Sequence, residues 1–271
     1  MPAPDTGADL ALLASSVREA GKIARTFFGG SYKRWSKAQG SPVTEADLAV
    51  DRFLNEQLRA ARPVYGWLSE ETDDDPARLD AATVFVVDPI DGTVAFMKNR
   101  PHFTICAAVV HQGRSVAGVV YNPISDEFFA AREGHGATRN GDSIRVSGRT
   151  EIEGCRMLGD KAMFAHRAWE TPPNIPWPNM HIETRSSIAY RMVLVAAGEF
   201  DAMLALSAKR DWDLAAADIV LSEAGGIATA HDGSSLQYNR AAAIQTSIVG
   251  AGPSLQAQLL KRVSHIELPY R

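Results

Sequence analysis

Thr83-Val84-Phe85-Val86-Val87-Asp88-Pro89-Ile90-Asp91-Gly92-Thr93 is the stretch that decides how this 271-residue chain folds. Its apolar, β-branched first half predicts a buried strand. Pro89 and Gly92 then allow a tight turn that brings both aspartates and several backbone groups toward one point. Two carboxylates so close would each resist ionisation unless a cation lay between them. Because Mg²⁺ prefers oxygen ligands, the stretch predicts a strand that ends at a magnesium-type site.

The composition excludes several classes of protein. The net charge is −4 and no basic tract is present, so nucleic acid is not expected as a partner. No apolar run approaches the ~20 residues that cross a bilayer, and the N-terminus lacks a signal-peptide pattern, which predicts a cytoplasmic protein without a membrane partner. Cys106 and Cys155 have no metal-type spacing, and we expect two buried thiols and no disulfide.

The N-terminal part of the chain predicts two helices. Residues 8–28 carry apolar side chains at helical spacing and are followed by Gly29-Gly30, a typical helix stop. Residues 31–43 are polar and predict an irregular segment. Thr44 then opens a second helix, with Asp47 at its third position as a capping-box-like partner.

Between residue 83 and about residue 147 the pattern changes to period two. Further strands are predicted at Phe103–Val110, Val116–Tyr121, Phe128–Arg132 and Ser143–Val146. Turn-forming residues separate them. We therefore expect an α+β half over residues 1–150, with an antiparallel-rich sheet behind two helices.

The remainder of the chain alternates between strand-like and helix-like segments. These are a strand at Cys155–Gly159, a helix at Ser187–Gly198, a strand at Phe200–Leu206, and a helix that Asp213 caps and that ends at Gly225-Gly226. They predict a smaller α/β half over residues 151–271. The segment Trp169–Met180 holds four prolines and two tryptophans, and we interpret it as a loop that is either a lid or a partner surface.

Three acidic positions outside the opening stretch complete a larger pattern. They are Asp47, Glu70 within Leu68-Ser69-Glu70-Glu71-Thr72, and Asp213 after Trp212. Taken with Asp-Pro-Ile-Asp-Gly-Thr and Glu223-Ala224-Gly225-Gly226, this pattern resembles the inositol monophosphatase family from Pro42 to Gly226. The resemblance implies a layered αβαβα fold and Mg²⁺-dependent hydrolysis of small phosphate monoesters.

The resemblance also implies a role for each site residue. The implied ligands of two or three Mg²⁺ ions are Glu70, Asp88, Asp91, Asp213 and the backbone carbonyl of Ile90, with Asp88 bridging two ions. The implied catalytic residues are Asp47 and Thr93, which orient and deprotonate the attacking water, together with Glu70. The implied phosphate-binding residues are Asp91, Gly92 and Thr93, the last two through backbone N–H groups. The resemblance further implies inhibition by Li⁺ near Asp91 and Asp213, and a homodimer.

Elementary chemistry agrees with these roles. Cleavage of a phosphate monoester requires positive charge around the transferring group more than it requires covalent chemistry from the protein. Metal ions supply that charge, so the protein must chiefly supply carboxylates. Other readings of the acids remain: Asp47 could only start a helix, Asp213 could be a plain N-cap, and Glu71 with Asp73–Asp75 is typical of a solvated loop.

Two rival motifs fit poorly. An EF-hand loop that began at Asp88 would need Glu at its twelfth position, where this chain has Asn99. A haloacid-dehalogenase-type site needs its two aspartates two residues apart, whereas Asp88 and Asp91 are three apart. That reading also leaves Glu70 and Asp213 unexplained.

The substrate is less well defined by the sequence. Relatives that act on inositol phosphates carry a Glu seven residues before the last aspartate, and this chain has Leu206 there. Segments 41–44, 68–71 and 186–187 are more similar to the bacterial 3'(2'),5'-bisphosphate nucleotidase branch. Contacts are predicted for Ser187, for Tyr190 stacking on a base, and for Arg191 or Lys209-Arg210 pairing with a second phosphate.

A nucleotide bisphosphate is therefore slightly favoured over inositol monophosphate. Histidinol phosphate and sugar bisphosphates are further alternatives. A different class of function is a non-catalytic regulatory protein that binds a transcription or ribosome partner on the same fold. That hypothesis predicts a damaged metal set, whereas all five ligand positions are intact in this sequence.

Overall fold

The computed structural model describes residues 3–36, 42–165 and 176–268 of the chain. Its helices are α1 (Thr6–Phe27), α2 (Glu45–Ala61), η1 (Pro76–Asp80, a 3₁₀ helix), α3 (Thr93–Met97), α4 (Lys161–Ala165), α5 (Ile188–Ala196), α6 (Asp211–Glu223) and α7 (Pro253–Val263). Its strands are β1 (Arg34–Ser36), β2 (Pro42–Thr44), β3 (Gly66–Ser69), β4 (Thr83–Asp91), β5 (Thr104–His111), β6 (Arg114–Asn122), β7 (Glu127–Arg132), β8 (Ala137–Arg139), β9 (Asp142–Ile144), β10 (Arg156–Leu158), β11 (His181–Glu183), β12 (Ala202–Ala205), β13 (Lys209–Arg210), β14 (Ile227–Thr229), β15 (Ile244–Gln245) and β16 (Ile248–Ala251).

A seven-stranded sheet in the order β3-β4-β5-β6-β7-β8-β9 dominates the N-terminal half. Every neighbouring pair is antiparallel except β3 with β4, which is parallel. The predicted antiparallel meander is therefore confirmed, while the parallel strand β3 is an addition to it. Strand β4 is buried along its whole length, and its register with β5 shifts between Asp88 and Asp91. A shift of this kind re-aims side chains, and here it affects the two predicted ligands of β4.

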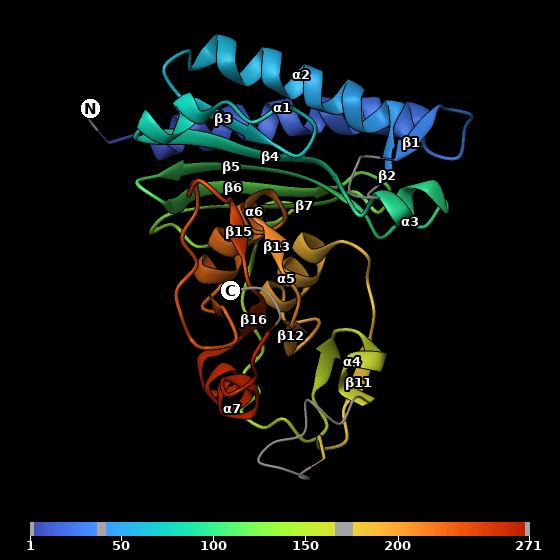
Figure 1. The fold of residues 1–271 in the computed structure, drawn as a ribbon, viewed down its shortest axis with the longest axis vertical. Helices are drawn as coiled ribbons and strands as arrows, with labels where there is room; N and C mark the ends of the chain where they lie inside the picture. The colour runs from blue at the N-terminus through green and yellow to red at the C-terminus, as the bar shows by residue number, and fades with distance from the viewer. Residues whose placement is uncertain (1–2, 37–41, 166–175, 269–271) are drawn as a thin grey trace.

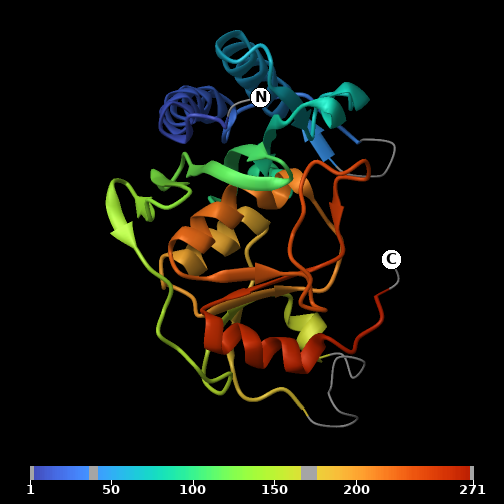
Figure 2. The same ribbon diagram turned by 90° about the vertical axis from the view of Figure 1, so that its left-hand side faces the viewer.

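The elements stack in five layers, as Figures 1 and 2 show. Helices α1 and α2 cover one face of the seven-stranded sheet, and α5 and α6 cover the other. The five-stranded sheet β11-β10-β12-β16-β14 follows beneath α5 and α6, and α7 covers its far side. Each contact between layers is an apolar cluster, which is the main stabilising term of such a stack. The predicted αβαβα sandwich is confirmed.

Local signals explain where the first two helices begin. The Asp5 side chain caps α1 by accepting from the backbone N–H groups of Gly7 and Ala8. Thr44 and Asp47 form the predicted capping box of α2, in which each side chain accepts from the backbone of the other residue. Helix α2 starts where the sequence places it, because its cap is a local feature, whereas α1 starts at Thr6, two residues before the predicted residue 8.

The expectation for residues 31–43 is partly wrong. Within the described part of that segment, β1 pairs with β2 as a short antiparallel ladder from Arg34–Thr44 to Ser36–Pro42. Residues 37–41 lie outside the described residues, as do residues 166–175, which include most of the predicted Trp169–Met180 loop. The described end of that loop places Trp177 edge-on against Phe164.

The two sheets follow one another along the chain, and the predicted boundary at residue 150 falls between β9 and β10. Because α5 and α6 share one apolar cluster with strands of both sheets, the boundary itself stays a prediction. Cys106 and Cys155 are free and buried, as expected. Among the described helices, none is both long and apolar enough to span a membrane.

Candidate metal centre and active site

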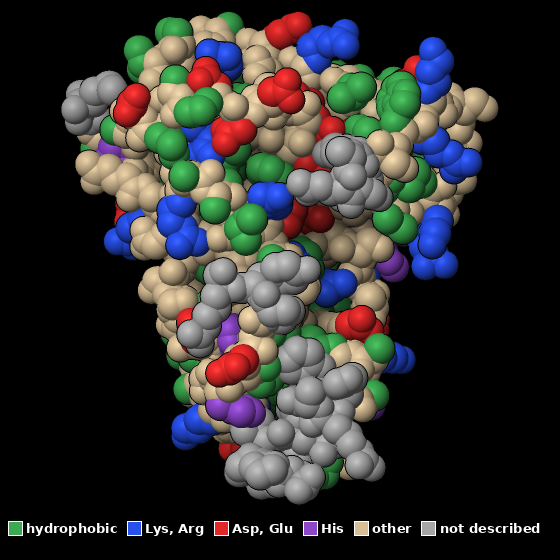
Figure 3. All heavy atoms as spheres, viewed as in Figure 1, with side chains coloured by type: hydrophobic (Ala, Val, Ile, Leu, Met, Phe, Trp, Pro, Cys, Tyr) green, Lys and Arg blue, Asp and Glu red, His purple; other side chains and the backbone are tan. Residues whose placement is uncertain are grey.

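Three aspartates from two distant parts of the chain converge. Asp88 and Asp91 lie at the end of β4, and Asp213 lies in the first turn of α6. One carboxylate oxygen from each lies within 4.8 Å of those of the other two. They line a cavity of about 200 Å³ whose other described walls are Pro42, Glu70, Ile90, Gly92, Thr93, Val94 and Ser186. In Figure 3, acidic side chains are visible in a recess on this face of the molecule.

The first turn of α6 orients Asp213. The helix begins at Asp211, and the backbone N–H of Arg210 donates to Asp213 Oδ2 at 2.8 Å. The prediction that Asp213 is the N-cap is therefore wrong by position, since Arg210 is the cap and Asp213 is the third helical residue. Asp213 Oδ2 still accepts from a backbone N–H at the start of the helix, and the other oxygen of this carboxylate remains available at the cavity.

Asp91 is held by the start of α5. Its Oδ2 accepts from Ser187 Oγ at 2.6 Å and from the backbone N–H of Ala189 at 2.7 Å. Ser187 is fully buried and is also the N-cap of α5, where its Oγ accepts from the backbone N–H of Tyr190. The structure thus places Ser187 behind a predicted metal ligand, where it positions that ligand.

The protonation of the three aspartates is perturbed. Burial, and then the neighbouring negative charges, raise the pKa of Asp88 well above its usual value. Burial raises the pKa of Asp91 to about 6, against the hydrogen bonds from Ser187 and α5, and raises that of Asp213 to about 8 with the charge of Asp91 as the next cause. A divalent cation would reverse this repulsion and displace the protons. An all-oxygen carboxylate set of this kind fits Mg²⁺.

Asp47 and Thr93 form a second pair beside the cluster. The Thr93 hydroxyl lies 3.1 Å from Asp47 Oδ1 and 3.1 Å from the Ile90 carbonyl, and it donates to one of them at a time. Both Asp47 and Thr93 are buried. Burial raises the pKa of Asp47 to about 6, while hydrogen bonds from Thr44 and Thr93 lower it. Asp47 is therefore a carboxylate with a basicity near neutral pH, and the predicted contact between the two side chains is present.

Glu70 lines the same cavity, although it is outside the tight group of three aspartates. The chain on either side of it is tied to Asp51 on α2. Ser69 Oγ donates to one carboxylate oxygen of Asp51, and Thr72 Oγ1 donates to the other at 2.8 Å. Trp67 Nε1 donates in turn to Thr72 Oγ1 at 3.2 Å. Sequence reasoning missed Asp51, whose signal is its position one turn after Asp47 on the same buried face of α2.

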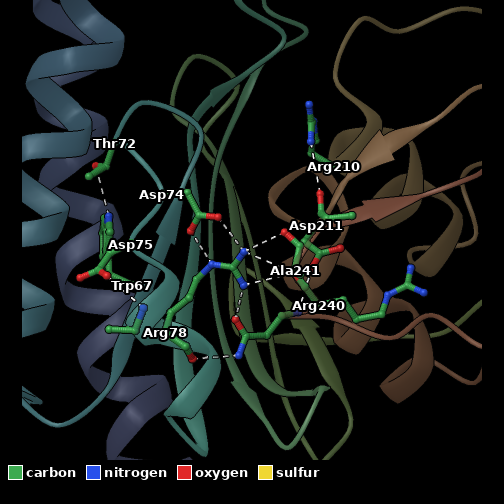
Figure 4. Close-up of polar contacts among 12 residues, drawn as sticks. Trp67, Thr72, Asp74, Asp75, Arg78, Arg210, Asp211, Arg240 and Ala241 are labelled. Atoms are coloured by element: carbon green, nitrogen blue, oxygen red, sulfur yellow. Dashed lines mark hydrogen bonds and ion pairs between the residues drawn. The ribbon is translucent and has the colours of Figure 1, made fainter.

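The acidic run after Glu70 is not simply a solvated loop. Asp74 forms a two-pronged ion pair with Arg78, at 2.5 Å to Nε and 2.8 Å to Nη2. The Arg78 side chain is buried, and its other contacts include the carbonyls of Arg240 and Ala241. Figure 4 shows the guanidinium group between Asp74 on one side and this distant backbone on the other. The i,i+4 spacing of Asp74 and Arg78 was the available signal.

The same network reaches the start of α6. Arg78 Nη1 donates to Asn239 Oδ1 at 2.7 Å, and the backbone N–H of Asn239 donates to Asp211 Oδ2 at 2.8 Å. Gln245 Nε2 donates to the other oxygen of Asp211 at 2.8 Å. Since Asp211 precedes Asp213 by two residues, the network fixes the helix start that orients Asp213.

The structure places some of the predicted substrate-contact residues at a cavity and others away from it. The Tyr190 side chain is buried in the core and its hydroxyl donates to Glu127, so it is turned away from the cavity and cannot stack on a base there. Arg210 donates to the carbonyl of Ala242, away from the aspartates. Arg191 and Lys209, by contrast, line a second cavity beside the first.

Comparisons with known proteins agree with this geometry. Residues 9–268 match the model of the inositol monophosphatase family. The chain is 32% identical over 234 residues to an inositol-1-monophosphatase of Rhizobium meliloti (83% of this chain, 86% of the relative). It is 33% identical over 202 residues to the Nus factor SuhB of Pseudomonas aeruginosa (71% and 73%). Among solved structures, the extragenic suppressor protein suhB of Bartonella henselae superposes with a TM-score of 0.81 at 28% identity, covering 95% of this chain and 99% of that one.

Proposed function

Because the chain belongs to the inositol monophosphatase family, we propose that it is a Mg²⁺-dependent phosphatase of a small phosphate monoester. The observation that carries the proposal is the convergence of Asp88, Asp91 and Asp213 beside the hydrogen-bonded pair Asp47 and Thr93. Asp88, Asp91, Asp213 and Thr93 line one cavity, Asp47 is hydrogen-bonded to Thr93, and the chemistry of these side chains is that of a metal-assisted hydrolase.

Magnesium would be held by Glu70, Asp88, Asp91, Asp213 and the carbonyl of Ile90, all of which line the cavity. When bound, it supplies the positive charge that stabilises the transferring phosphoryl group and makes water a better nucleophile. Without cations, these carboxylates would repel a phosphate, so the proposal requires activity to depend on the metal.

The residues around the cluster then have distinct tasks. Thr93 donates its hydroxyl proton to Asp47, which leaves the oxygen of Thr93 free to accept from the attacking water. As the water loses its proton to the Thr93 oxygen, the hydroxyl proton of Thr93 passes to Asp47, whose pKa of about 6 suits a base at neutral pH. The backbone N–H groups of Gly92 and Thr93, at the left-handed turn where Gly92 has φ of +100°, are proposed to hold the phosphate.

The substrate in this proposal is a small phosphorylated metabolite. A 3'(2'),5'-nucleotide bisphosphate is slightly favoured and inositol monophosphate is the main alternative. A cytoplasmic location belongs to the same proposal and is supported by the two free, buried thiols. The homodimer and the inhibition by Li⁺ stay predictions.

The test is phosphate release from a panel of monoesters with Mg²⁺ and with excess EDTA. We expect release only with Mg²⁺, and its collapse in Asp88→Asn. A matched control is Asp142→Asn, which removes an exposed carboxylate from β9. Hydrolysis that is independent of the metal, or near-normal turnover in Asp88→Asn, would remove the basis of the proposal.

A second candidate function has one specific observation in its favour, which is the similarity to proteins named Nus factor SuhB. In that case the chain would act as a regulatory binding protein on the same fold. The discriminating experiment is complementation of a deletion strain with Asp88→Asn. Growth at the wild-type level would favour the regulatory function, and failure to complement would favour catalysis.

A further inference from the structure

A second cavity, of about 370 Å³, adjoins the cavity that holds the aspartates. The two share Ser186 as a wall, so the second cavity lies next to a phosphate that would be held at Asp91 and Asp213. Its walls come from α5, from the end of β12, from the segment that leads into β13 and from the start of α4. We therefore expect the rest of a substrate to lie in this second cavity.

Arg191 is the most distinctive residue of this cavity. Its side chain is about nine-tenths buried, with 9% exposure for the residue. Its Nε donates to the carbonyl of Arg185 at 2.6 Å, which fixes the plane of the guanidinium group. Within the described ranges of the chain, neither of its terminal nitrogens has a protein acceptor. A buried guanidinium with free donors is costly unless an anion completes its hydrogen bonds.

Lys209 brings a second positive charge to the same cavity from another part of the chain. Its ammonium group is held in place by Ser207 Oγ at 2.7 Å and by the carbonyls of Ser207 and Ala208. Burial lowers the pKa of Lys209, and the positive charge of Arg191 lowers it further, while Asp213 and Asp91 raise it. The two cations are therefore close enough to repel each other.

The remaining walls offset this charge only in part, since Asp160 attracts Arg191, as Asp91 does from the first cavity. Asp160 is the one acidic side chain among the described lining residues, and its Oδ1 is occupied by the backbone N–H of Ala162 at 2.9 Å. The other side of the cavity is apolar, with Met163, Leu204 and Leu206. Apolar walls offer no partners to the hydroxyl groups of a neutral polyol, and they strengthen the attraction between the cations and an anion.

We propose that this cavity binds a second anionic group of the substrate through Arg191 and Lys209, so that the chain selects phosphate monoesters that carry a further phosphate or carboxylate. The inference rests on the proposed phosphatase function and deepens it. Arg191 supplies the free donors, and Lys209 supplies a fixed charge. Neither residue lines the cavity of the three aspartates, so we assign both to specificity and not to bond cleavage.

The experiment compares kcat/KM within pairs of compounds that differ by one anionic group. Two pairs test a second phosphate: adenosine 3',5'-bisphosphate against adenosine 3'-phosphate, and fructose 1,6-bisphosphate against fructose 1-phosphate. A third pair, 3-phosphoglycerate against glycerol 3-phosphate, tests a carboxylate. We expect the wild-type protein to prefer the additional anion by at least tenfold in one pair or more, and the pair identifies which anion is bound.

Variants then assign the preference to the cavity. In Arg191→Met the preference should fall by about tenfold or more, as expected for the loss of a charge-assisted hydrogen bond. Arg191→Lys keeps the charge and should retain more of the preference. Arg114→Met removes an arginine that lines a different cavity and should leave the ratio unchanged. If Arg191→Met does not fold, Lys209→Met provides the same comparison.

The outcomes separate this inference from the function on which it rests. If the protein hydrolyses all compounds with ratios near one, the specificity inference is wrong and the phosphatase function stands. If a preference exists but neither Arg191→Met nor Lys209→Met reduces it, the cavity is wrongly assigned. If no compound in the panel is hydrolysed with Mg²⁺, the phosphatase function itself fails.

Discussion

Replacing Arg78 by Met tests whether the network behind the aspartates is structurally necessary. The guanidinium group is buried at 2% exposure and donates to Asp74, to Asn239 and to the carbonyls of Arg240 and Ala241. Methionine keeps much of the apolar stem and removes every one of these donors. The acceptors near residue 240 then lose their partners inside the protein.

The expected cost follows from the burial of each partner. Breaking a buried ion pair by removing one member costs about 3–5 kcal/mol. The Asp74 side chain is 47% exposed and can regain water, so we expect the lower end, about 3 kcal/mol. For a chain of this length, that loss lowers the melting temperature by roughly 6–12 °C. The affinity for Mg²⁺ should also fall, because the network ends at the helix turn that orients Asp213.

The assay is thermal unfolding of wild type and Arg78→Met, with Mg²⁺ and with EDTA, followed by a magnesium titration. Asp74→Asn is the matched control, since it removes the charge at the exposed end and keeps an acceptor for Arg78. It should cost no more than about 1 kcal/mol. An Arg78→Met protein that melts within about 2 °C of wild type and binds Mg²⁺ normally would refute the reasoning.

Three other outcomes follow from the site and the core. Asp47→Asn or Thr93→Ala should lower kcat by ~10²-fold or more while calorimetry still detects Mg²⁺ binding, since the loss is that of a positioned base. Mg²⁺ should raise the melting temperature of wild type but not of Asp88→Asn, because binding to the folded state alone stabilises it. Burial raises the pKa of Asp218, whose carboxylate accepts from Tyr238, to about 6. The folded state therefore holds this proton more tightly than the unfolded state, and stability is lost as the pH rises from about 4 to 6. Urea midpoints should show Asp218→Asn more stable than wild type at pH 8, with no difference at pH 4.

The features that could be predicted from sequence are those that depend on neighbouring residues. The proposed ligands Asp88 and Asp91 lie at the end of a buried strand within one short stretch, and the capping box of Thr44 and Asp47 spans a single helical turn. Local spacing also predicted that α6 begins near Asp213, although it placed the cap three residues too late. The exact start of the helix depends on contacts from a distant part of the sequence. Here Asn239 and Gln245 bind Asp211, so the helix begins at Asp211 and Asp213 becomes its third residue.

The orientation of Tyr190 could not be predicted for a different reason. Every residue of α5 is buried, so this helix has no polar face from which the direction of a side chain could be inferred. The orientation of Arg191 could not be predicted either. It follows Tyr190 directly in the chain, yet its side chain lines the second cavity. Apolar periodicity therefore predicts side-chain directions for a half-exposed helix, but not for a helix packed between two sheets.

Long-range pairings were the remaining gap. Arg78 meets Asn239 across 161 positions of the chain, and no local pattern marks such a contact. The strands after residue 226 were also not predicted, since β14, β15 and β16 have two to four residues each, and α7 was missed although it has 11 residues. Strands this short carry too little alternation to be separated from turns, and their pairing is decided by the layers above and below them.

The start of α5 has a consequence for how this chain can evolve. Asp91 is held there by the Ser187 hydroxyl and by a main-chain N–H group, whereas the Arg191 side chain faces the neighbouring cavity. A main-chain donor persists through almost any side-chain replacement. If position 191 selects the substrate as proposed, a duplicated gene can acquire a new substrate by changing this position, while the contacts that hold Asp91 are inherited intact.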